Sequence, residues 1–545
     1  MKKILAAILV LAACLEAGAQ SKLFKLGQSV EVNTAILQEL NRSYVDSLPV
    51  SKMTIAGINA MLETLDPYTI YVPEEENENF EMMIGKTYGG IGASIYKPTK
   101  DVPVMINEPY ADSPAAKAGL QCGDEILAID GKTTIGLTAA ESSDKMKGKP
   151  GTQVTFHVRK VRSGEIKDIT ITRERIHIPD IEYAGLLDGT KTGYIRIGGF
   201  TEGLGADFRG RVKELKKQGM DKLVVDLRGN GGGLMNEAVN IVSAFVPRGS
   251  LVVSSKGNKL IGEQQFKTSQ DPVDLEIPLI VMVDSGSASA SEIVSGALQD
   301  LDRATIMGTR TFGKGLVQSI RPLPYNGQLK VTTAKYYTPS GRCVQAIDYA
   351  HRNEDGSVGH IPDSLTHEFK TARGRVVKDG GGITPDVEIK GKDYSRLVYS
   401  LVVNGVVEQY AMEYVKTHES IPAAKDFHFT DFDSFVEFAK GKEFDYRSSA
   451  RANFDQMKKQ LEKDQLAESM KDELAAMEKA LEMDKETFLR LKKDEIIPFI
   501  EREIAIRYWF QEGGVEIDIR YDDALRTALS VPLEGIAVYS ATATR

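Results

Sequence analysis

The chain has 545 residues, of which 42% are hydrophobic and 27% are charged. A chain of that length predicts about three or four domains and more than one apolar core. The net charge of −9, with no strongly basic segment, argues against generic binding of nucleic acid. The cysteines, Cys14, Cys122 and Cys343, are too few for a disulfide framework in a chain this large. We expect Cys122 and Cys343 to be packing residues.

The amino terminus has the pattern of an export signal. Two lysines follow Met1, and the apolar run ILAAILVLAA after them is too short to span a bilayer. Residues 1–19 are therefore predicted to be a signal peptide that directs the chain to the bacterial periplasm. Two processing sites compete, because Ala17-Gly18-Ala19 is typical of cleavage after Ala19, whereas residues 11–14 resemble a lipoprotein box with Cys14 as the acylated residue. We favour cleavage after Ala19, with a lipid anchor on Cys14 as the alternative.

Residues 20–84 are predicted to form an amino-terminal helical region. Apolar residues recur at helical spacing from Val30 to Leu65, and Pro49 divides this stretch into two helices. The acidic residues 74–81 indicate a solvated helix face.

Between residues 85 and 175 the pattern changes to short strands separated by glycines. A glycine-rich turn at residues 89–93 comes first, and residues 113–131 (SPAAKAGLQCGDEILAIDG) combine small residues with a strand and a turn. Residues 154–158 and 166–172 alternate apolar and polar side chains, as strands with one buried face do. These features predict a small separate β-rich domain.

Residues 176–392 predict an α/β domain. Strands and helices alternate along it, and this order predicts a sheet whose functional loops follow the strand ends. The predicted elements are the strand 193–197, the helix 204–217, the strand 223–227 that leads into the glycine-rich segment 228–233, the buried strand 277–283, the closely packed helix 288–298 and the strand 330–337.

Serines and one lysine in this domain indicate a hydrolase. Ser287, Ser289 and Ser291 lie at the predicted start of a helix, and Lys314 follows within the glycine-flanked segment FGKG. A hydroxyl becomes a strong nucleophile when a nearby base takes its proton, and lysine can be that base only as a neutral amine. The ordinary pKa of lysine is about 10.4, so burial must lower it for that role. Serines before helices more often serve as caps, and spacing alone does not decide between the two roles.

This segment resembles the active site of the carboxy-terminal processing peptidases, which are serine endopeptidases with a Ser/Lys dyad and an inserted PDZ domain. Their nucleophile is the middle serine of a SASASE-like run, the lysine lies 25 positions later and a glutamine four positions after it, and here these positions hold Ser289, Lys314 and Gln318. The resemblance implies that Ser289 is the nucleophile and Lys314 the general base. It also implies that Gln318 orients the lysine amine through a hydrogen bond.

Residues 226–233 (DLRGNGGG) resemble a second motif of that family, DLRxNxGG. The resemblance implies that one backbone N–H of the oxyanion hole comes from Gly232 or Gly233. The other would come from Ala290, the residue after the nucleophile. Glycines also favour a tight turn, and the sequence leaves the choice between Gly232 and Gly233 open. The implied chemistry needs no metal, nucleotide or other cofactor.

The resemblance covers roughly residues 30 to 390 and includes a PDZ domain at residues 85–175. In such a domain the backbone amides of Gly90, Ile91 and Gly92 would receive the terminal carboxylate of a peptide. We therefore expect a serine endopeptidase that recognises envelope proteins with apolar carboxy-terminal tails. The alternative is a catalytically silent PDZ scaffold or chaperone that retains the fold. Further matching segments are residues 65–69 (LDPYT), 338–342 (TPSGR) and 380–387 (GGGITPDV).

Two other motifs point to different chemistry and are weaker. Residues 308–314 (GTRTFGK) have the spacing of a phosphate-binding loop, but Gly315 stands where a Ser or Thr hydroxyl should reach the metal. Ser142 and Lys145 have S-x-x-K spacing without the supporting motifs of penicillin-recognising enzymes. A solvated helix face explains this second pair better.

Three histidines, His351, His360 and His367, lie in or beside the polar stretch 352–375. They lack the compact spacing of metal ligands, so we expect no metal site and interpret them as solvated loop residues. The stretch itself is predicted to be an exposed excursion of the catalytic domain.

Residues 393–545 are dominated by helical patterns rich in Lys, Glu, Leu, Met and Ala. Such a domain could pack against the protease, form a homo-oligomer or bind an adaptor, and periodicity does not choose among these. The whole chain is thus predicted to be a mixed α/β catalytic core with an inserted PDZ domain, amino-terminal helices and a mostly helical carboxy-terminal domain.

Overall fold

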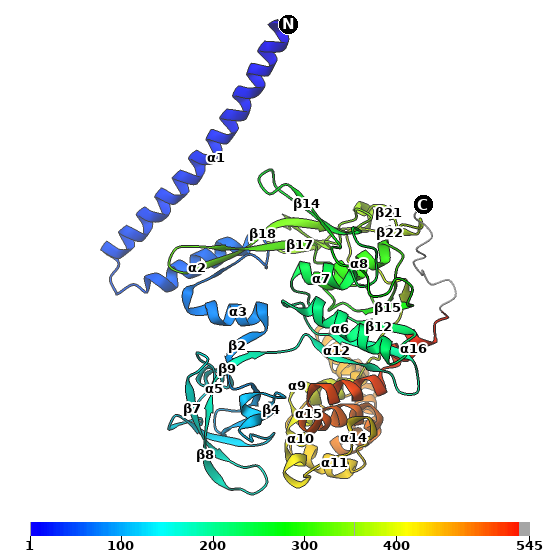
Figure 1. Cartoon of the computed structure of the whole chain (residues 1–545). Coiled ribbons are helices and arrows are strands. Elements are labelled where there is room, and N and C mark those ends of the chain that lie inside the picture. Colours follow the sequence, from blue (N-terminus) through cyan, green and yellow to red (C-terminus); the bar gives the residue numbers. More distant parts are fainter. Residues whose placement is uncertain (1, 354, 533–545) are drawn as a thin grey trace. The chain divides into compact units, whose positions relative to one another are not determined.

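The computed structural model describes residues 2–353 and 355–532, with residues 2–22 described by their backbone alone (Figure 1). The chain divides into two compact units, Met1–Tyr71 and Val72–Arg545. The first unit contains α1 (Lys2–Ser43) and α2 (Val50–Glu63), and it ends within β1 (Ile70–Val72). The predicted signal peptide falls in α1, apart from Met1, which lies outside the described residues. None of the described helices is long and apolar enough to cross a membrane.

The second unit begins with η1 (Glu74–Glu76) and α3 (Asn77–Gly85). The sequence predicts a solvated acidic helix here, but Phe80 is only 5% exposed. One apolar side chain among many acidic ones gives too weak a periodicity to predict this buried side.

The inserted β-rich domain is connected through a two-stranded ribbon. The chain enters it along β2 (Thr87–Gly90) and leaves along β9 (Glu174–His177), and these strands pair antiparallel, with Gly90 opposite Glu174. The chain therefore enters and leaves the inserted domain through this single two-stranded ribbon.

The main sheet of the inserted domain is antiparallel, in the order β3-β4-β5-β7-β8, with β6 paired to β5. Strand β3 ends the sheet, and α5 packs beside it. Fully buried side chains such as Ile106, Ile126 and Phe156 form the core. The elements are β3 (Ala93–Tyr96), β4 (Val104–Pro109), α4 (Pro114–Lys117), β5 (Glu125–Ile129), β6 (Lys132–Thr133), α5 (Ala139–Met146), β7 (Gln153–Arg159) and β8 (Ile166–Thr172).

A six-stranded sheet in the order β10-β11-β12-β15-β16-β23 forms the centre of the α/β domain. All neighbouring strands pair in parallel except β10, the antiparallel edge strand. Strand β15 (LIVMV) is buried along its whole length, as a strand covered on both faces must be. The strands are β10 (Ile181–Leu186), β11 (Thr192–Ile197), β12 (Lys222–Asp226), β15 (Leu279–Val283), β16 (Thr305–Gly308) and β23 (Val387–Glu388).

Helices from two parts of the chain cover the two faces of this sheet. On one face Val225 and Val281 belong to a core that includes α6 (Leu204–Lys217), α7 (Met235–Val242) and α8 (Ala290–Asp300). On the other face Val224 and Ile280 belong to a core shared with α15 (Lys493–Tyr521) and α16 (Asp523–Ser530) of the carboxy-terminal domain. The carboxy-terminal domain therefore completes the core of the α/β domain.

A second sheet carries the hairpin β17–β18, which pairs through β18 with β13, and β13 pairs with β14. The polar stretch after β18 forms two small hairpins, β19–β20 and β21–β22. These strands are β13 (Leu251–Gly257), β14 (Glu263–Lys267), β17 (Leu316–Pro322), β18 (Gln328–Tyr337), β19 (Ile347–Arg352), β20 (Val358–His360), β21 (Glu368–Lys370) and β22 (Val376–Lys378), with η2 (Asp363–Leu365) between the hairpins.

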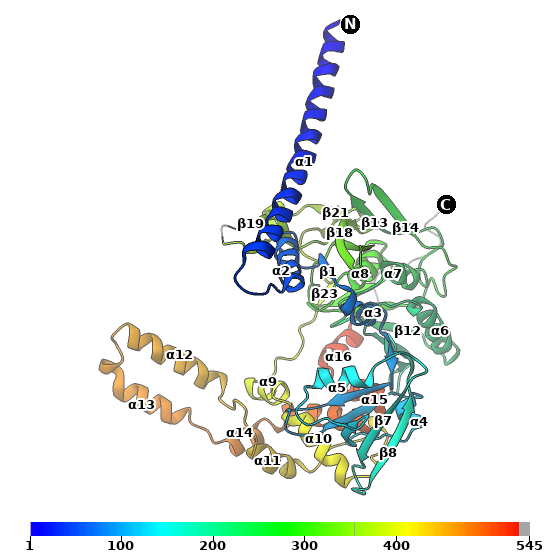
Figure 2. The same ribbon diagram turned by 90° about the vertical axis from the view of Figure 1, so that its left-hand side faces the viewer.

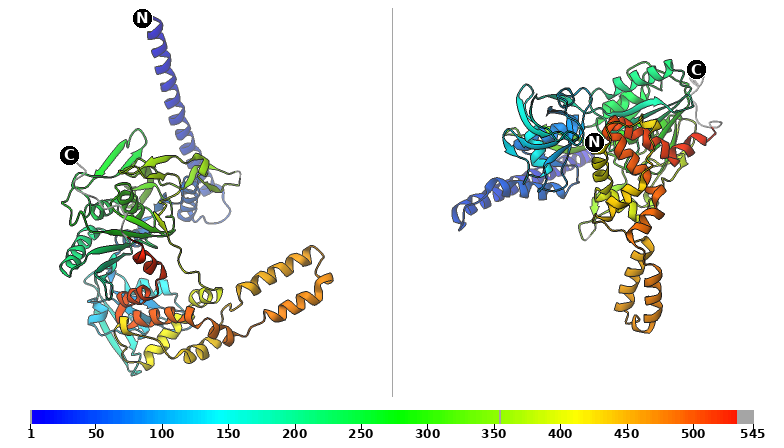
Figure 3. Two further views of the ribbon diagram at one scale, coloured as in Figure 1. Left: turned by 90° about the vertical axis from the view of Figure 1, so that its right-hand side faces the viewer. Right: turned by 90° about the horizontal axis from the view of Figure 1, so that it is seen from below.

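The carboxy-terminal domain is helical, and its α12 and α13 run side by side as a projecting hairpin (Figures 2 and 3). The domain contacts the inserted domain through an apolar cluster that includes Cys122, Met412 and Val415. Cys122 is thus a packing residue, as the sequence predicts. The helices are α9 (Arg396–Val403), α10 (Val406–Thr417), η3 (Ala424–Asp426), α11 (Phe432–Lys440), α12 (Ser449–Lys463), η4 (Glu468–Met470), α13 (Lys471–Ala480), α14 (Lys485–Leu491), α15 (Lys493–Tyr521) and α16 (Asp523–Ser530).

This architecture confirms the predicted fold class, with amino-terminal helices, a mixed α/β core, an inserted domain and a helical carboxy-terminal domain. One smaller prediction is wrong. Ser142 is fully buried and its hydroxyl donates to the carbonyl of Thr138, so this side of α5 faces the domain core and not solvent.

Candidate active site

One cavity collects the predicted catalytic residues at the carboxyl ends of four neighbouring parallel strands. The loops that follow β11, β12, β15 and β16 contribute Phe200, Gly232, Ser289 and Lys314 respectively to its lining. Ligand sites in open α/β sheets typically lie at this edge, where successive loops converge. The cavity has a volume of about 440 Å³.

Ser289 occupies the tight connection between β15 and α8. Its φ of +56° and ψ of −110° place a non-glycine residue in a sparsely populated backbone region. Such strain persists only where the surrounding structure holds it, and it concentrates at functional sites. Ser289 directly precedes the first residue of α8, Ala290, whose side chain is fully buried.

Glu292 ties the start of α8 to the loop that carries Lys314. Its Oε2 accepts the backbone N–H of Ser289 at 2.9 Å and that of Lys314 at 2.8 Å. Its Oε1 accepts the Thr311 hydroxyl at 2.6 Å and the Gly313 N–H at 2.7 Å. The side chain is fully buried, and burial raises its pKa above the ordinary value while these hydrogen bonds act in the opposite direction.

Asn230 holds the glycine-rich turn against the neighbouring loops. Its Nδ2 donates to the carbonyl of Ile197 at 2.7 Å, and its Oδ1 accepts the N–H of Gly232 at 2.8 Å. Its backbone carbonyl accepts the N–H of Ala288 at 3.0 Å and the hydroxyl of Ser291 at 2.9 Å. Through its side chain and its backbone carbonyl, the buried Asn230 thus connects the end of β11 with the segments that follow β12 and β15.

Gly232 lies directly against Ser289. It has a φ of +94°, and a Cβ at this position would come within 2.6 Å of the Ala288 carbonyl oxygen and 2.8 Å of the Ala290 nitrogen. Only glycine satisfies both the backbone conformation and this close approach. The N–H of Gly232 donates to the side-chain oxygen of Asn230 and is therefore already in use.

Lys314 and Gln318 line the cavity from the segment that enters the hairpin β17–β18. The Gln318 side chain donates through Nε2 to the Thr332 hydroxyl on β18 at 3.2 Å. The buried Tyr336 on the same strand donates its hydroxyl to the carbonyl of Ser289 at 3.1 Å. The second sheet therefore braces both the lysine segment and the serine turn.

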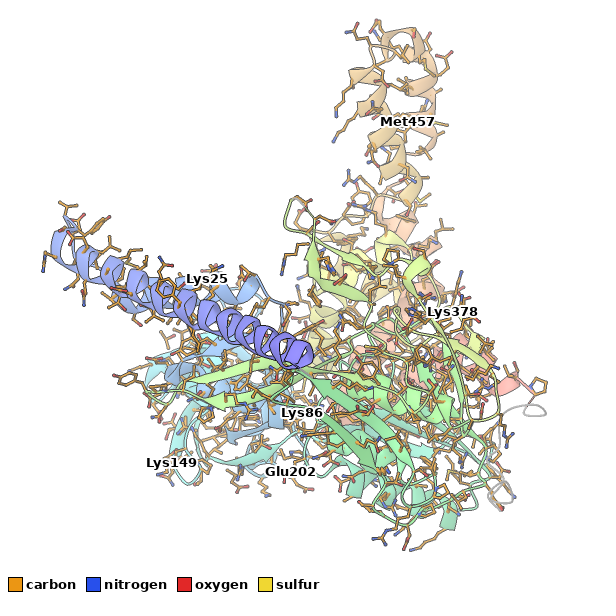
Figure 4. The ribbon with its side chains drawn as sticks, turned by 90° about the horizontal axis from the view of Figure 1, so that it is seen from above. Lys25, Lys86, Lys149, Glu202, Lys378 and Met457 are labelled. Atoms are coloured by element: carbon orange, nitrogen blue, oxygen red, sulfur yellow. The ribbon has the colours of Figure 1, made fainter. Side chains whose placement is uncertain are left out.

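The cavity wall is apolar and cationic. Among the residues that the structure describes, the charged ones that line it are Lys86, Lys314 and Lys330. Lys86, which is labelled in Figure 4, forms an ion pair at 3.0 Å with the buried Asp180. Burial lowers the pKa of Lys330. The apolar wall suits the side chains of a peptide. The lining includes Met83, Ile84, Phe200, Leu234, Met235, Ile293, Leu316, Val317 and Ile320.

The predicted peptide-binding residues of the inserted domain lie between β2 and β3. Gly92 has a φ of +73°, and its carbonyl accepts the N–H of Tyr110 at 2.9 Å. The Ile91 carbonyl accepts the N–H of Ala115 at 2.9 Å, and its side chain is 2% exposed in the domain core. Gly90 ends β2. This loop therefore leads into the terminal strand β3, beside α5, where an added peptide strand would pair.

The weaker sequence patterns find no support as sites. Within the residues described, no three His, Cys, Asp or Glu side chains are grouped so that they could hold a metal ion. His351, His360 and His367 are exposed. The segment after Gly315 is the strand β17, and not the helix that a phosphate-binding loop requires.

Profile and sequence comparisons decide the family. The profile of peptidase family S41 matches residues 191–350, that of a PDZ domain matches residues 105–160, and that of the C-terminal helical domain of a probable PDZ-protease matches residues 397–531. A protein of Bartonella bacilliformis called carboxy-terminal-processing protease is 39% identical over 316 residues, which are 57% of this chain and 71% of that protein. This chain belongs to the carboxy-terminal processing protease family.

Other members of the family are similar over comparable lengths. A Staphylococcus aureus protein called probable CtpA-like serine protease is 35% identical over 308 residues, which are 56% of this chain and 60% of that protein. A solved structure of the photosystem II D1 C-terminal processing protease is 28% identical and covers 65% of this chain and 91% of its own, with a TM-score of 0.34. The predicted family and the predicted enzyme class, a serine-type peptidase, are confirmed.

Two residues that position this site escaped the sequence prediction. Glu292 had a readable signal, because Ser289 and Glu292 form the S-x-x-E pattern of a helix capping box. For Asn230 the sequence signal was weaker: it lies inside the glycine-rich turn. The sequence does not reveal which loops its side-chain amide contacts. Both residues position the site from outside the reacting atoms.

Proposed function

We propose that this protein is an endopeptidase that cleaves peptide bonds with a Ser289/Lys314 dyad through an acyl-enzyme. The observation that carries the proposal is the shared cavity, which Ser289, Lys314 and Gln318 line together with the glycine-rich turn. The strained backbone of Ser289 and the Glu292 bonds to both catalytic segments support it.

In this mechanism the Ser289 hydroxyl gives its proton to the neutral amine of Lys314 while Oγ attacks the carbonyl carbon of the scissile bond. The tetrahedral intermediate collapses, the C–N bond breaks, and Lys314 returns the proton to the leaving amine. Water then attacks the acyl ester, its proton passes through Lys314 to Oγ of Ser289, and the new carboxylate leaves. Gln318 orients the lysine amine through Oε1, because its Nε2 already donates to Thr332.

The developing oxyanion receives hydrogen bonds from the backbone N–H groups of Ala290 and Gly233. Ala290 is the first residue of α8, so its N–H points out of a helix N-terminus, where negative charge is stabilised. Gly233 is preferred over Gly232 because the Gly232 N–H donates to Asn230. Preorganised donors of this kind are typically the largest single contribution to acyl-transfer catalysis.

We further propose that the PDZ domain binds the apolar carboxy-terminal tail of an envelope protein. The tail would add a strand to β3 and place its carboxylate at residues 90–92. The chain would reach the envelope through the predicted signal peptide, with cleavage after Ala19, and acylation of Cys14 is the alternative. Mass spectrometry of the mature amino terminus distinguishes these two, because a diacylglyceryl group on Cys14 would contradict cleavage after Ala19.

The dyad is tested with an unfolded protein substrate and the variants Ser289→Ala and Lys314→Ala. Each variant should lose at least about 1000-fold in kcat/KM, as removal of a nucleophile or its base does in serine hydrolases. Ser319→Ala and Lys335→Ala are matched controls from the neighbouring hairpin and should retain activity. A fluorophosphonate should label Ser289 of the wild type, and cleavage that persists in Ser289→Ala would contradict the dyad.

Tail recognition is tested separately with two substrates that differ only in their last three residues, apolar in one and acidic in the other. The substrate with the apolar tail should have the higher kcat/KM, because its KM should be lower. The scaffold hypothesis predicts instead that the protein binds the apolar tail and never cleaves the chain.

A further inference from the structure

A second and larger cavity lies behind the loop that carries Lys314. Its volume is about 840 Å³, and the residues that line it differ from those around Ser289. It is enclosed by the loop after β16, the hairpin β21–β22 and the glycine segment 380–382. Such a volume matches sites for small organic ligands.

Cationic side chains dominate this wall. Four of them, Arg310, Arg342, Arg375 and Lys378, face two carboxylates, Asp379 and Asp386. Lys378 lies on β22, well separated from Lys86 at the Ser289 cavity (Figure 4). Which of these cations could attract a ligand's negative charge depends on whether a carboxylate already pairs with each of them.

Among the described residues, two of these four cations form no ion pair with a carboxylate. Arg375 pairs with Asp302 at 2.6 Å and Asp386 at 2.5 Å, so its charge is balanced. Arg310 and Lys378 pair with no carboxylate among residues 2–353 and 355–532, and both side chains are exposed at the cavity.

A buried guanidinium in the same wall also has an unused donor. Arg342 is 1% exposed, and its Nη2 donates to Gln299 at 2.6 Å and lies 2.8 Å from Asp300. Its Nε is buried and has no hydrogen-bond partner within the described part of the chain. Buried donors are nearly always satisfied, so a ligand acceptor would account for this one.

The glycine segment keeps room for the cations. A Cβ on Gly381 would lie 2.9 Å from the Nη1 of Arg310, so the guanidinium rests against the bare backbone. Gly380 and Gly382 have φ values of +72° and +74°, which glycine adopts without strain. Glycine at position 381 therefore leaves room for the guanidinium of Arg310 beside the backbone.

The same wall touches the residues that hold the dyad. Thr311 lines the cavity, accepts the N–H of Ile383 at 2.6 Å and donates its hydroxyl to Glu292 at 2.6 Å. Glu292 in turn binds the backbone of Ser289 and Lys314. A ligand that fixes this wall would therefore also fix the catalytic loop.

We propose that this cavity binds a small multivalent oxyanion, a phosphate or polycarboxylate group, held by Arg310, Lys378 and Arg342. Binding strengthens the hydrogen bond between Thr311 and Glu292 and thereby raises protease activity. The effect on activity rests on the proposed function. A multivalent anion fits because two cations that pair with no described carboxylate, Arg310 and Lys378, line the same cavity.

The test uses the full chain with inorganic phosphate or citrate, and sodium chloride at equal ionic strength as the reference. Isothermal titration calorimetry should detect binding of at least one of the two anions, and which of them binds tells phosphate from carboxylate recognition. Arg310→Ala and Lys378→Ala should each weaken binding at least tenfold. Lys370→Ala, on the same hairpin but outside the cavity, should bind as the wild type does.

Failure of this site and failure of the dyad are distinguishable, because Ser289→Ala should still bind the anion with unchanged affinity. An equal response to sodium chloride, or equal weakening by Lys370→Ala, would overturn the site. Binding without any increase in kcat/KM would overturn the coupling to the dyad.

Discussion

The Oε2 atom of Glu292 accepts the backbone N–H of Lys314 at 2.8 Å, and the same atom accepts the N–H of Ser289 at 2.9 Å. One buried carboxylate therefore sets the spacing of two segments that approach the cavity from different strands. Catalysis by proximity depends on such spacing, because a displacement of about 1 Å can reduce the rate about 100-fold.

Glu292→Gln should lower kcat/KM by about 10- to 100-fold, since an amide offers one acceptor oxygen where the carboxylate serves four donors. The loss should fall mainly on kcat, because the substrate-binding wall is unchanged. Steady-state kinetics measures this, and Glu202→Gln, an exposed glutamate, is the matched control. Loss of fluorophosphonate labelling in parallel with kcat would confirm that the serine turn has shifted.

The ionisation of Glu292 should make both the stability and the activity of the protein depend on pH. Burial raises the pKa of Glu292 above its ordinary value near 4.5, so the folded protein binds its proton more tightly than the unfolded chain. The free energy of unfolding that comes from this group is therefore greatest at low pH and falls as pH rises through the raised pKa. Activity should move in the opposite direction, because only the ionised carboxylate accepts all four donors.

The measurement is the difference in Tm between wild type and Glu292→Gln from about pH 4 upward, beside the pH–rate profile of each. As pH rises, the Tm of the wild type should fall relative to the Tm of Glu292→Gln. A wild-type profile whose acid limb is identical in the variant would contradict this role of Glu292.

Gly232→Ala should reduce kcat/KM by at least about 100-fold, comparable to the loss of an oxyanion-hole donor. The added Cβ would lie 2.6 Å from the Ala288 carbonyl oxygen, and φ of +94° is unfavourable for alanine. Gly231→Ala is the control, since its Cβ would meet nothing within 4 Å. Equal activity of the two variants, measured on samples with equal circular dichroism, would contradict the close packing of this turn on the serine.

The sequence predicts the location of the site better than its internal connections. Alternating strands and helices already place functional loops at strand ends, and in the structure Gly232, Ser289 and Lys314 line one cavity there. The four bonds of Glu292 could not be predicted in full, because Thr311 and Gly313 are remote from it in sequence and meet it only after the strands align. Contacts between domains, such as Cys122 with Met412, have no local sequence signal at all.

Lys330→Gln should reduce kcat/KM selectively for substrates with an acidic residue near the scissile bond, by about 2- to 5-fold, the size of a partly exposed ion pair. The charged residues of the cavity wall within the described part of the chain are all lysines, so Lys330 has an electrostatic preference for negative side chains. Lys335→Gln is the matched control on the same strand, outside this cavity. Matched acidic and neutral peptides measure the ratio, and a ratio unchanged in Lys330→Gln would exclude this role.

Gln511→Ala should loosen the contact between the carboxy-terminal and PDZ domains. Glu108 on β4 is 3% exposed and accepts the backbone N–H of Gln511 at 3.1 Å and its side-chain Nε2 at 3.0 Å. Removing the side-chain donor leaves one buried carboxylate oxygen unsatisfied, which costs about 1–3 kcal/mol. Burial also raises the pKa of Glu108, so this cost should grow as pH rises and the group ionises. Hydrogen exchange in β4 and around residue 511 should therefore be faster in the variant than in the wild type at the same pH, and this ratio should grow as pH rises. Gln460→Ala on the projecting hairpin should leave both segments as protected as in the wild type.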